Sequence, residues 1–329
     1  MTDRWHSILT PTQRPGAIAV IMLRHPDPGE IGITRAQPGR LALCDLLGID
    51  RGVVLGIDAQ CWLLMPHGGM AIVRSISDRL TAMGIGMNPA PDPTAVYSEA
   101  SSEIEAWCLH GLSTFPSPMA VDILLKHSRR WDELGIRTIE CSAGVESMRD
   151  DCELARLMHP PTVAAVGRAN VGKSSLINAL VGQQVALVAD IAGTTRDHVG
   201  VPLDLGGLVV RWIDTPGVDA HIKDSDELTI AQRVLANAEL VVHCIDSVDD
   251  PGVLDRRLSA SIAPGVPVVR VGTRSDLGAH ACPVDARVSV GKQPVGIASL
   301  VGMLRALLLP ASVLEDPRPW RFWSVMGSG

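Results

Sequence analysis

The sequence has few aromatic residues, few lysines and no excess of basic charge. Of its 329 residues 3% are aromatic and four are lysine, and Lys plus Arg number 29 against 36 for Asp plus Glu, a formal net charge of −7. This charge argues against a protein that coats DNA or adsorbs to anionic membranes, because both surfaces repel it. With 46% apolar residues, the chain can still bury the cores of two or three domains.

Cysteine spacing and apolar run length exclude two further classes of protein. The seven cysteines form no CxxC pair and no cluster with histidine at metal-ligand spacing, which favours a reducing compartment over secretion. The apolar stretch at 16–23 has the length of one strand and ends at Arg24, so it predicts neither a signal peptide nor a membrane span. We therefore expect a cytoplasmic protein without membrane contact, in which Cys44 and Cys61 are small core residues.

Proline and charge divide the N-terminal half of the chain. The run MNPAPDPT at 87–94 interrupts helix and sheet and is typical of a linker, so residues 1–88 are predicted to form a small α+β domain. Residues 95–158 show helical periodicity, and 91–158 contain 6 basic against 12 acidic residues. This helical segment is a poor RNA-binding surface, because phosphate contacts need Lys and Arg.

Residues 160–312 alternate short apolar runs with helical patterns, which is typical of an α/β domain with a mostly parallel sheet. The predicted strands are 162–166, 208–213, 240–245 and 266–272, and the predicted helices lie near 173–181, 226–236 and 296–309. Two glycines at 206–207 between apolar runs predict a hairpin, and hence one antiparallel edge strand. Residues 313–329 are predicted to form a short tail, which contains Trp320, Phe322 and Trp323.

The strongest motif follows the first predicted strand of that domain. Residues 167–174 read GRANVGKS and fit the phosphate-loop pattern GxxxxGK[ST] between a strand and a helix. Glycines allow backbone N–H groups to turn toward phosphate oxygens, the helix N-terminus favours anions, Lys173 adds positive charge and Ser174 can ligate Mg²⁺. The predicted phosphate-binding residues here are Asn170, Val171, Gly172, Lys173, Ser174 and Ser175.

Two later segments are predicted to complete the phosphate site. The sequence DTPG, which is Asp214, Thr215, Pro216 and Gly217, follows a predicted strand, where the carboxylate can hold the Mg²⁺ shell and the glycine amide can meet the γ-phosphate. Between it and the phosphate loop lies a loop whose hydroxyl groups can reach Mg²⁺ and the γ-phosphate, through Thr195 above all. This predicted first switch contains Ala189, Asp190, Ile191, Ala192, Gly193, Thr194 and Thr195.

Base recognition is predicted after the strand at 266–272. Residues 273–276 read TRSD, and the Asp276 carboxylate can accept both N1–H and N2–H of guanine, which adenine does not offer. The usual G-protein motif is N-K-x-D, so Thr273 lacks a side-chain amide and Arg274 must supply its aliphatic stem beneath the base. Ser289 and Val290 stand where backbone groups would contact guanine O6.

Together these motifs resemble the TrmE (MnmE) tRNA-modification GTPases within the Era-like G proteins. GRANVGKSSLINAL, ADIAGTTRDHV, DTPG and TRSD occur in that family's order, and TPTQRPGAIAV and PHGG are similar to short N-terminal pieces of it. The resemblance implies a P-loop G domain that hydrolyses GTP to GDP with Mg²⁺, in which Lys173, Thr195 and Gly217 act in catalysis. It also implies a K⁺ site at Asn170, Ala189, Ile191 and Thr194.

The chain departs from the family in ways that leave parts of its chemistry open. Val218 stands where Ras-like proteins place Gln, so another group must position the attacking water. The resemblance implies a downstream carboxylate, Asp226 or Glu227, although a one-residue shift would place Thr229 at the matching position. The family's C-terminal helical segment with its Cys tail and its S-[FY]-T-G-E-D stretch have no counterpart here, which suggests a reduced form. Folate binding and tRNA modification therefore stay open, and His67 in PHGG is more readily a structural histidine than a ligand.

Three functions follow from these observations. The first is a TrmE-like GTPase that retains a link to tRNA modification through a partner protein, with homodimerisation through the N-terminal domain and RNA contact left open. The second is a nucleotide-gated scaffold that binds GTP and recruits a partner with little or no hydrolysis. The third and weakest is a ribosome-assembly factor, which would need a basic RNA-binding module after the G domain.

Overall fold

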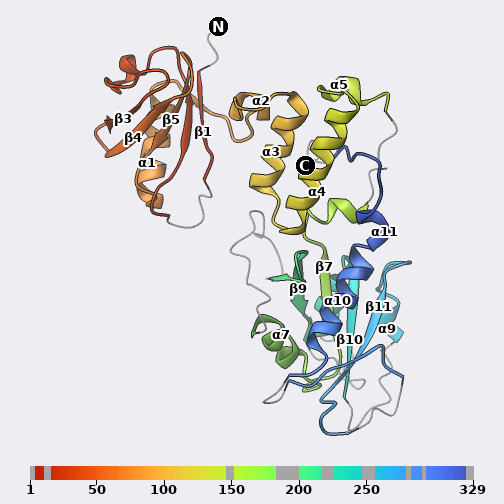
Figure 1. The fold of residues 1–329 in the computed structure, drawn as a ribbon. Coiled ribbons are helices and arrows are strands. Elements are labelled where there is room, and N and C mark those ends of the chain that lie inside the picture. The colour runs from red at the N-terminus through yellow and green to blue at the C-terminus, as the bar shows by residue number, and fades with distance from the viewer. Residues whose placement is uncertain are drawn as a thin grey trace. The chain divides into compact units, whose positions relative to one another are not determined.

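The computed structural model describes residues 4–10, 16–145, 152–182, 200–216, 226–246, 256–278, 283–290 and 294–323, with only the backbone of Cys152, Asp226 and Glu227. The chain divides into two compact units, residues 1–110 and 111–329. Each unit contains a six-stranded sheet within these described residues (Figure 1). None of their helices is both long and apolar enough to cross a membrane.

Unit 1 is built on a mainly antiparallel sheet with the strand order β3-β4-β5-β2-β1-β6. The strands are β1 (Trp5–Ile8), β2 (Ile21–Arg24), β3 (Leu41–Leu46), β4 (Asp50–Gly56), β5 (Cys61–Met65) and β6 (Gly86–Met87). Alternate residues of β4 are buried, as expected for a sheet with one covered face. Helix α1 (Met70–Ala82) supplies Val73, Ile76 and Leu80 to the core beneath the sheet, and η1 (Pro28–Ile31) adds Ile31.

A buried histidine links this sheet to α1. His6 on β1 is fully buried, with its Nε2 2.8 Å from the Ser77 hydroxyl and its Nδ1 3.1 Å from the Ile85 carbonyl oxygen. Burial lowers the pKa of His6 below its ordinary value, despite the opposing effect of its backbone hydrogen bonds. His6 is therefore a neutral part of the core of unit 1.

The proline-rich run at 87–94 is more structured than a linker, so that prediction is wrong in part. Met87 belongs to β6, which pairs with β1 in parallel, and Pro93 begins the short helix α2 (Pro93–Val96). Asp92 accepts the backbone N–H of Thr94 at 2.8 Å and caps this helix. Proline at the first helical position has no N–H to leave unsatisfied, so the run begins a helix where an internal proline would break one.

Unit 2 contains the predicted parallel sheet, with the strand order β12-β11-β10-β7-β9-β8. The strands are β7 (Thr162–Val166), β8 (Val201–Asp204), β9 (Val209–Asp214), β10 (Leu240–Asp246), β11 (Val268–Thr273) and β12 (Ala286–Arg287). All neighbouring pairs are parallel except β8 and β9, which form the predicted hairpin at Gly206 and Gly207. The fold class predicted from the sequence is confirmed.

Helices cover this sheet. They are α7 (Lys173–Gly182), α8 (Asp226–Ala236), α9 (Arg256–Ser259) and α10 (Ile297–Leu308). Leu228, Val234 and Leu235 of α8 pack with Leu258 of α9 and with Val241 and neighbouring strand residues in one apolar cluster. Figure 1 shows α10 crossing in front of the sheet, and its Ile297, Leu300, Leu304 and Leu308 are all buried.

Several helices lie within residues 95–158, and the division between the two units falls within the first long one. Its helices are α3 (Glu103–Thr114), α4 (Met119–Glu133), α5 (Ile139–Ser142) and α6 (Cys152–Ala155), and α11 (Ala311–Leu314) follows α10. The start of α4 is joined to the β8–β9 hairpin, because Met119 donates its N–H to the Gly207 carbonyl at 2.9 Å and Ser117 Oγ accepts the Val209 N–H at 3.1 Å.

Residues of the predicted tail pack against α4. Five of the ten aromatic residues of the chain gather here with ring centroids 5.1 to 6.4 Å apart. Trp131, Trp320 and Phe322 are fully buried, and Phe115 and Trp323 complete this aromatic cluster. Aromatic side chains bury large areas, so the few that the sequence contains are concentrated where the segment after α11 meets α4.

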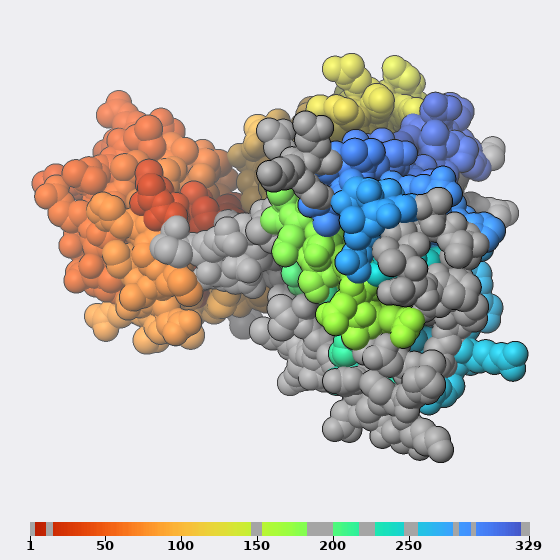
Figure 2. All heavy atoms as spheres, turned by 90° about the horizontal axis from the view of Figure 1, so that it is seen from below, coloured from red at the N-terminus to blue at the C-terminus, as the bar shows by residue number. Residues whose placement is uncertain are grey.

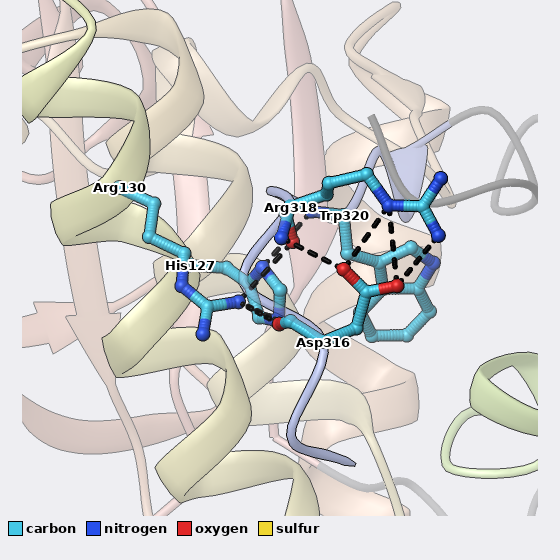
Figure 3. A network of polar contacts seen from close by, with 5 residues as sticks. All are labelled: His127, Arg130, Asp316, Arg318 and Trp320. Atoms are coloured by element: carbon cyan, nitrogen blue, oxygen red, sulfur yellow. Dashed lines mark hydrogen bonds and ion pairs between the residues drawn. The ribbon is translucent and has the colours of Figure 1, made fainter. Parts of the chain in front are cut away.

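Polar contacts beside the aromatic cluster fix that segment (Figure 3). Arg130 donates to the carbonyl oxygens of Asp316 at 2.7 Å and Arg318 at 3.1 Å, and the Trp320 N–H donates to His127 Nδ1 at 2.9 Å. The Arg318 guanidinium holds the pKa of Asp316 down to about 2, and burial, aided by Arg130, lowers that of His127 to about 4. His127 is therefore neutral, with Nδ1 as its acceptor.

Candidate functional site

The predicted phosphate loop connects β7 to α7 in the middle of the unit 2 sheet. The carboxyl ends of β7, β9, β10 and β11 lie at one edge of the sheet because these neighbouring strands are parallel. Ligands of open α/β folds bind in the crevice outside such an edge. The segment that carries the loop and α7, green in Figure 2, lies at the surface of unit 2. The fold therefore places the predicted loop where a ligand can reach it.

The loop requires residues that tolerate unusual backbone conformations. Gly167 has φ +153°, and a Cβ there would lie 2.6 Å from the carbonyl oxygen of Cys244 on β10. Gly172 has φ +101°, and Asn170 adopts the left-handed conformation with φ +60°, which Asn tolerates better than most residues. The tight turn thus packs directly on the neighbouring strand.

Lys173 lies inside the loop rather than on its outer surface. The residue is 7% exposed, and its Nζ donates to the carbonyl oxygens of Gly167 at 3.1 Å and Arg168 at 3.0 Å. These bonds fold the side chain back over the loop from the first turn of α7. The positive charge is therefore held beside the backbone N–H groups of the loop and the N-terminus of the helix, where an anion is favoured.

Ser174 and Asp214 meet across the sheet edge. The exposed Ser174 hydroxyl donates to Asp214 Oδ2 at 3.0 Å, and Asp214 is the last residue of β9. Thr215 is buried and donates both its N–H and its hydroxyl to the Ala165 carbonyl oxygen, at 3.1 and 2.8 Å. Because Thr215 is tied to β7, the carboxylate before it is fixed opposite the phosphate loop. Hydroxyl and carboxylate oxygens are the ligands that Mg²⁺ prefers.

Thr273 joins the predicted base-recognition loop to the phosphate loop. Its buried hydroxyl lies 2.5 Å from the Val171 carbonyl oxygen and 3.0 Å from that of Ile245. A Cβ at Gly172 would lie 3.5 Å from the Thr273 side chain, an ordinary contact distance, so the φ of +101° is what favours glycine there. In the sequence, Thr273 replaces the Asn of N-K-x-D and lacks its side-chain amide. The structure shows that the Thr273 hydroxyl instead links two loops.

The remaining predicted base-site residues follow Thr273 or lie nearby. Arg274 has φ +55° and forms an ion pair with Asp246 at 2.8 Å, and Asp276 is exposed two residues later. The Ser275 N–H donates to the Val288 carbonyl at 3.2 Å, which brings the loop to the residue before Ser289. A cavity of about 450 Å³ opens beside these loops and is lined by Ser175, Asn178, Ala179, Gly182, Val290 and Pro294.

Several predicted site residues lie outside the described residues. They are Ala189, Asp190, Ile191, Ala192, Gly193, Thr194, Thr195 and Gly217. Asp226 and Glu227 form the backbone of the first turn of α8, and their side chains are likewise outside the description. Asn170 is exposed on the phosphate loop. The roles assigned to all of these residues stay predictions.

Three residues that the sequence analysis considered as possible ligands or nucleophiles, Cys44, Cys61 and His67, make structural contacts. Cys44 is buried in the core of unit 1, and burial raises the pKa of Cys61 to about 11 and that of Cys244 to about 12. These pKa values are far above neutral pH, so the Cys61 and Cys244 thiols stay protonated and poorly nucleophilic. His67 is exposed, with Nδ1 2.9 Å from Asp50, which also accepts the His67 backbone N–H at 2.8 Å.

Sequence reasoning missed Asp246. It is the last residue of β10 and pairs in register with Thr273, and its carboxylate holds the Arg274 guanidinium. A signal was present, because Asp246 follows the apolar run 240–245 just as Asp214 follows the run 208–213. A carboxylate that directly follows a buried parallel strand lies at the functional edge of the sheet.

Comparison with known proteins agrees with this geometry. Residues 162–272 match the family described as 50S ribosome-binding GTPase. The tRNA modification GTPase MnmE of Acidiphilium cryptum is 29% identical over 286 residues, 86% of this chain and 58% of that protein. The MnmE of Synechococcus sp. is 34% identical over 205 residues, 51% of this chain and 44% of that protein. The resemblance to TrmE (MnmE) proteins is confirmed, and unit 2 contains a P-loop G domain.

The likeness covers part of the relatives only. The chain spans about half the length of these two curated relatives. Among solved structures, the G-domain of FeoB from Methanococcus jannaschii is 23% identical, with a TM-score of 0.35 over 46% of this chain and 99% of that chain.

Proposed function

We propose that this chain binds GTP at the sheet edge of unit 2 and hydrolyses it to GDP and phosphate. The observation that carries this proposal is the meeting of three predicted motifs at one edge. Ser174 of the phosphate loop is hydrogen-bonded to Asp214, and Val171 of the same loop is hydrogen-bonded to Thr273. The relatives named tRNA modification GTPase support the same activity.

The phosphate loop would bind the triphosphate and stabilise charge as the γ-phosphoryl group is transferred. Backbone N–H groups of residues 170–175 and the positive end of α7 favour the anion, and Lys173 adds a full charge. Lys173 already bonds two carbonyl oxygens of its loop, so its stem is oriented before the ligand binds. Catalysis of this reaction is mostly positioning and charge stabilisation.

Ser174 and Asp214 would hold Mg²⁺, together with Thr195. The described donors fit this ion, because a hydroxyl and a carboxylate oxygen 3.0 Å apart face one another beside the loop. When bound, Mg²⁺ neutralises charge that develops on the phosphate oxygens. The K⁺ assignment rests on Asn170 and the resemblance, with Ala189, Ile191 and Thr194 as the other proposed ligands.

Asp276 would select guanine, with Arg274 beneath the base and the Ser289–Val290 backbone near its O6. Asp276 is exposed at the loop that Thr273 anchors, so its carboxylate is accessible to a ligand. The water that attacks the γ-phosphate would be positioned by Asp226 or Glu227 at the start of α8. A link to tRNA modification is the physiological context that the relatives' names support, and we propose that the link runs through a partner protein.

Single-turnover GTP hydrolysis with Mg²⁺, compared in KCl and NaCl at equal ionic strength, tests the proposal. We expect hydrolysis that K⁺ accelerates. Lys173→Ala should abolish GTP binding, whereas Lys126→Ala, which removes the same charge from the exposed face of α4, should leave binding and turnover unchanged. If the protein binds GTP but does not hydrolyse it in either salt, the nucleotide-gated scaffold is the correct function and the GTPase proposal is wrong.

Two further substitutions separate the roles. Asp276→Asn should shift preference from guanine toward xanthine nucleotides, because an amide donates where the carboxylate accepts. Asp226→Ala and Glu227→Ala are expected to leave GTP binding intact, and one of them should stop turnover. Hydrolysis at the parent rate in both would remove these carboxylates from the reaction.

A further inference from the structure

An ion pair lies at the ends of two neighbouring strands beside the base-recognition loop. Asp246 ends β10, Thr273 ends β11, and these two residues are partners in the parallel register. Arg274 comes next, and its Nη1 lies 2.8 Å from Asp246 Oδ2. The pair therefore joins the base loop to the strand that lies directly beside it.

The two partners of this ion pair differ in exposure. The Asp246 side chain is 13% exposed and the Arg274 side chain 46% exposed. A partly buried carboxylate on a rigid strand is a fixed anchor, and an ion pair to it holds its partner more firmly than a pair of two exposed, flexible side chains. The guanidinium of Arg274 is thus held at one end, and its aliphatic stem spans the distance from the loop backbone to the strand end.

Contacts on either side of Arg274 tie it to two parts of the proposed nucleotide site. Thr273 bonds the Val171 carbonyl of the phosphate loop, and Ser275 donates its N–H to Val288, next to Ser289. The Arg274 backbone is itself in the left-handed conformation, which few non-glycine residues adopt. Arg274 therefore lies in a constrained backbone between the loop that would hold phosphates and the segment that would meet guanine.

We propose that Asp246 is a positioning residue for guanine recognition, and that it acts by holding the guanidinium of Arg274 so that the stem is presented to the face of the base. The inference rests on the proposed function. Arg suits this role because its planar head offers several donors to a carboxylate while the stem remains extended. The ligand is the guanine base of a nucleotide, and Asp246 itself need not touch it.

The same strand provides a matched control. Arg270 on β11 forms an ion pair with Asp285 at 3.2 Å, and both partners are more than one-third exposed. This second pair joins β11 to the residue before β12, away from the phosphate and base loops. A general need for ion pairs on β11 would make Asp285→Asn as harmful as Asp246→Asn, whereas positioning of the base predicts an effect of Asp246→Asn alone.

The test is calorimetric titration of the full chain with GDP and, separately, with inorganic pyrophosphate, both with Mg²⁺. Pyrophosphate probes the phosphate loop without the base, so it also reports whether each variant is folded. We expect Asp246→Asn to weaken GDP binding by about tenfold, the size expected for loss of a close charge pair, with pyrophosphate binding unchanged. Asp285→Asn should alter neither, and Asp246→Glu, which keeps the carboxylate, should recover part of the GDP affinity.

A double-mutant cycle shows through which residue Asp246 acts. In an Arg274→Ala background, Asp246→Asn should add less than about a twofold loss, because residues that act as a unit are not additive. An undiminished loss in that background, or an equal loss for GDP and pyrophosphate, overturns the inference while GTP binding by the parent stands. A parent protein that binds pyrophosphate but not GDP overturns the proposed function and the inference with it.

Discussion

The two sheets of this protein contain equal numbers of described strands but place their polar residues differently. In unit 1 most neighbours are antiparallel, so strands end alternately at opposite edges. In unit 2 five neighbouring strands are parallel, so the residues after them meet at one edge. Strand direction, rather than strand number, therefore explains why Lys173, Asp214 and Asp246 lie at the same edge of the sheet.

The polar side chains of the two units also have different surroundings. In unit 1 His6 is fully buried and bonded on both ring nitrogens to α1 and to the Ile85 carbonyl, which fixes the fold. In unit 2 Ser174 and Asp214 are exposed and bonded to each other across two segments. Buried, satisfied groups stabilise a core, whereas exposed groups that converge from several loops can exchange their bonds for a ligand.

The largest expected difference between the units concerns two glycines that have no room for a side chain. Gly167→Ala should lower the free energy of unfolding of unit 2 by about 3 kcal/mol, because the new carbon meets the Cys244 carbonyl oxygen. It should also abolish GDP binding. Gly68→Ala brings a carbon against the Gly16 carbonyl oxygen and should destabilise unit 1 to a similar degree, with GDP affinity unchanged.

Thermal unfolding measures the stability of both variants, and a separate GDP titration of the folded proteins measures their affinity. Gly302→Ala is the control, since a Cβ on this α10 residue meets nothing within 4 Å, and alanine should raise helix stability by up to about 1 kcal/mol. Loss of GDP binding in Gly68→Ala would contradict the assignment of the whole nucleotide site to unit 2.

The second prediction concerns pH and unit 2. The pKa of His127 is lowered to about 4 in the folded chain, against 6.5 when unfolded, so below pH 6.5 the unfolded chain takes up a proton that the folded chain does not. The free energy of unfolding of unit 2 should therefore fall by about 3 kcal/mol between pH 6.5 and 4. Asp316, with a pKa of about 2, stays ionised in this range.

Urea unfolding at several pH values tests this prediction. His127→Asn, which keeps an oxygen acceptor for the Trp320 N–H but does not titrate, should remove most of the fall. The lowered pKa of His6 should likewise reduce the free energy of unfolding of unit 1 as the pH falls. A fall of the same size in His127→Asn would assign the pH dependence to other groups.

A smaller effect is expected from the hydroxyl that joins the loops. Thr273→Val keeps the shape of the side chain but leaves two buried carbonyl oxygens without this donor, so unit 2 should lose about 1–2 kcal/mol of stability. GDP affinity should fall several-fold because the base loop is no longer tied to the phosphate loop. Thr81→Val in unit 1, which removes a hydroxyl bonded to the Ser77 carbonyl at 3.0 Å, should leave GDP affinity at the parent value.

The smallest effect is expected at His67 in unit 1. Its side chain is 71% exposed, whereas that of its partner Asp50 is 11% exposed, so solvent screens the His67 end of this pair. His67→Ala should therefore change the free energy of unfolding by less than about 0.5 kcal/mol, because Asp50 still accepts the backbone N–H of residue 67. GTP turnover should stay the same. A large loss of turnover would show that unit 1 takes part in the reaction.

Much of unit 2 could be predicted from the sequence because its signals are local. The phosphate loop follows a strand and opens a helix within 20 residues, and the glycine pair at 206–207 marks its hairpin. The bounds of the helices predicted near 173–181 and 226–236 differ from those in the structure by no more than one residue. Such motifs need no knowledge of distant contacts.

The parts that sequence reasoning missed depend on residues far apart in the chain. β6 exists because residues 86–87 pair with β1, some 80 positions earlier, and no local pattern records that partner. The residues after α11 are fixed through Trp320 and His127, which are 193 positions apart. Asp246 and Arg274 are 28 positions apart, and only the parallel pairing of β10 with β11 brings them together.

The sequence by itself determined the kind of chemistry and the class of fold. Its spacing of glycine, lysine and serine predicts a phosphate loop, and its alternation of apolar runs and helical patterns predicts a parallel sheet. The tertiary structure alone decided which side chains meet, namely Ser174 with Asp214, Thr273 with Val171 and Arg274 with Asp246. The physical reason is that a hydrogen bond or ion pair depends on distance in space, which strand order and direction set.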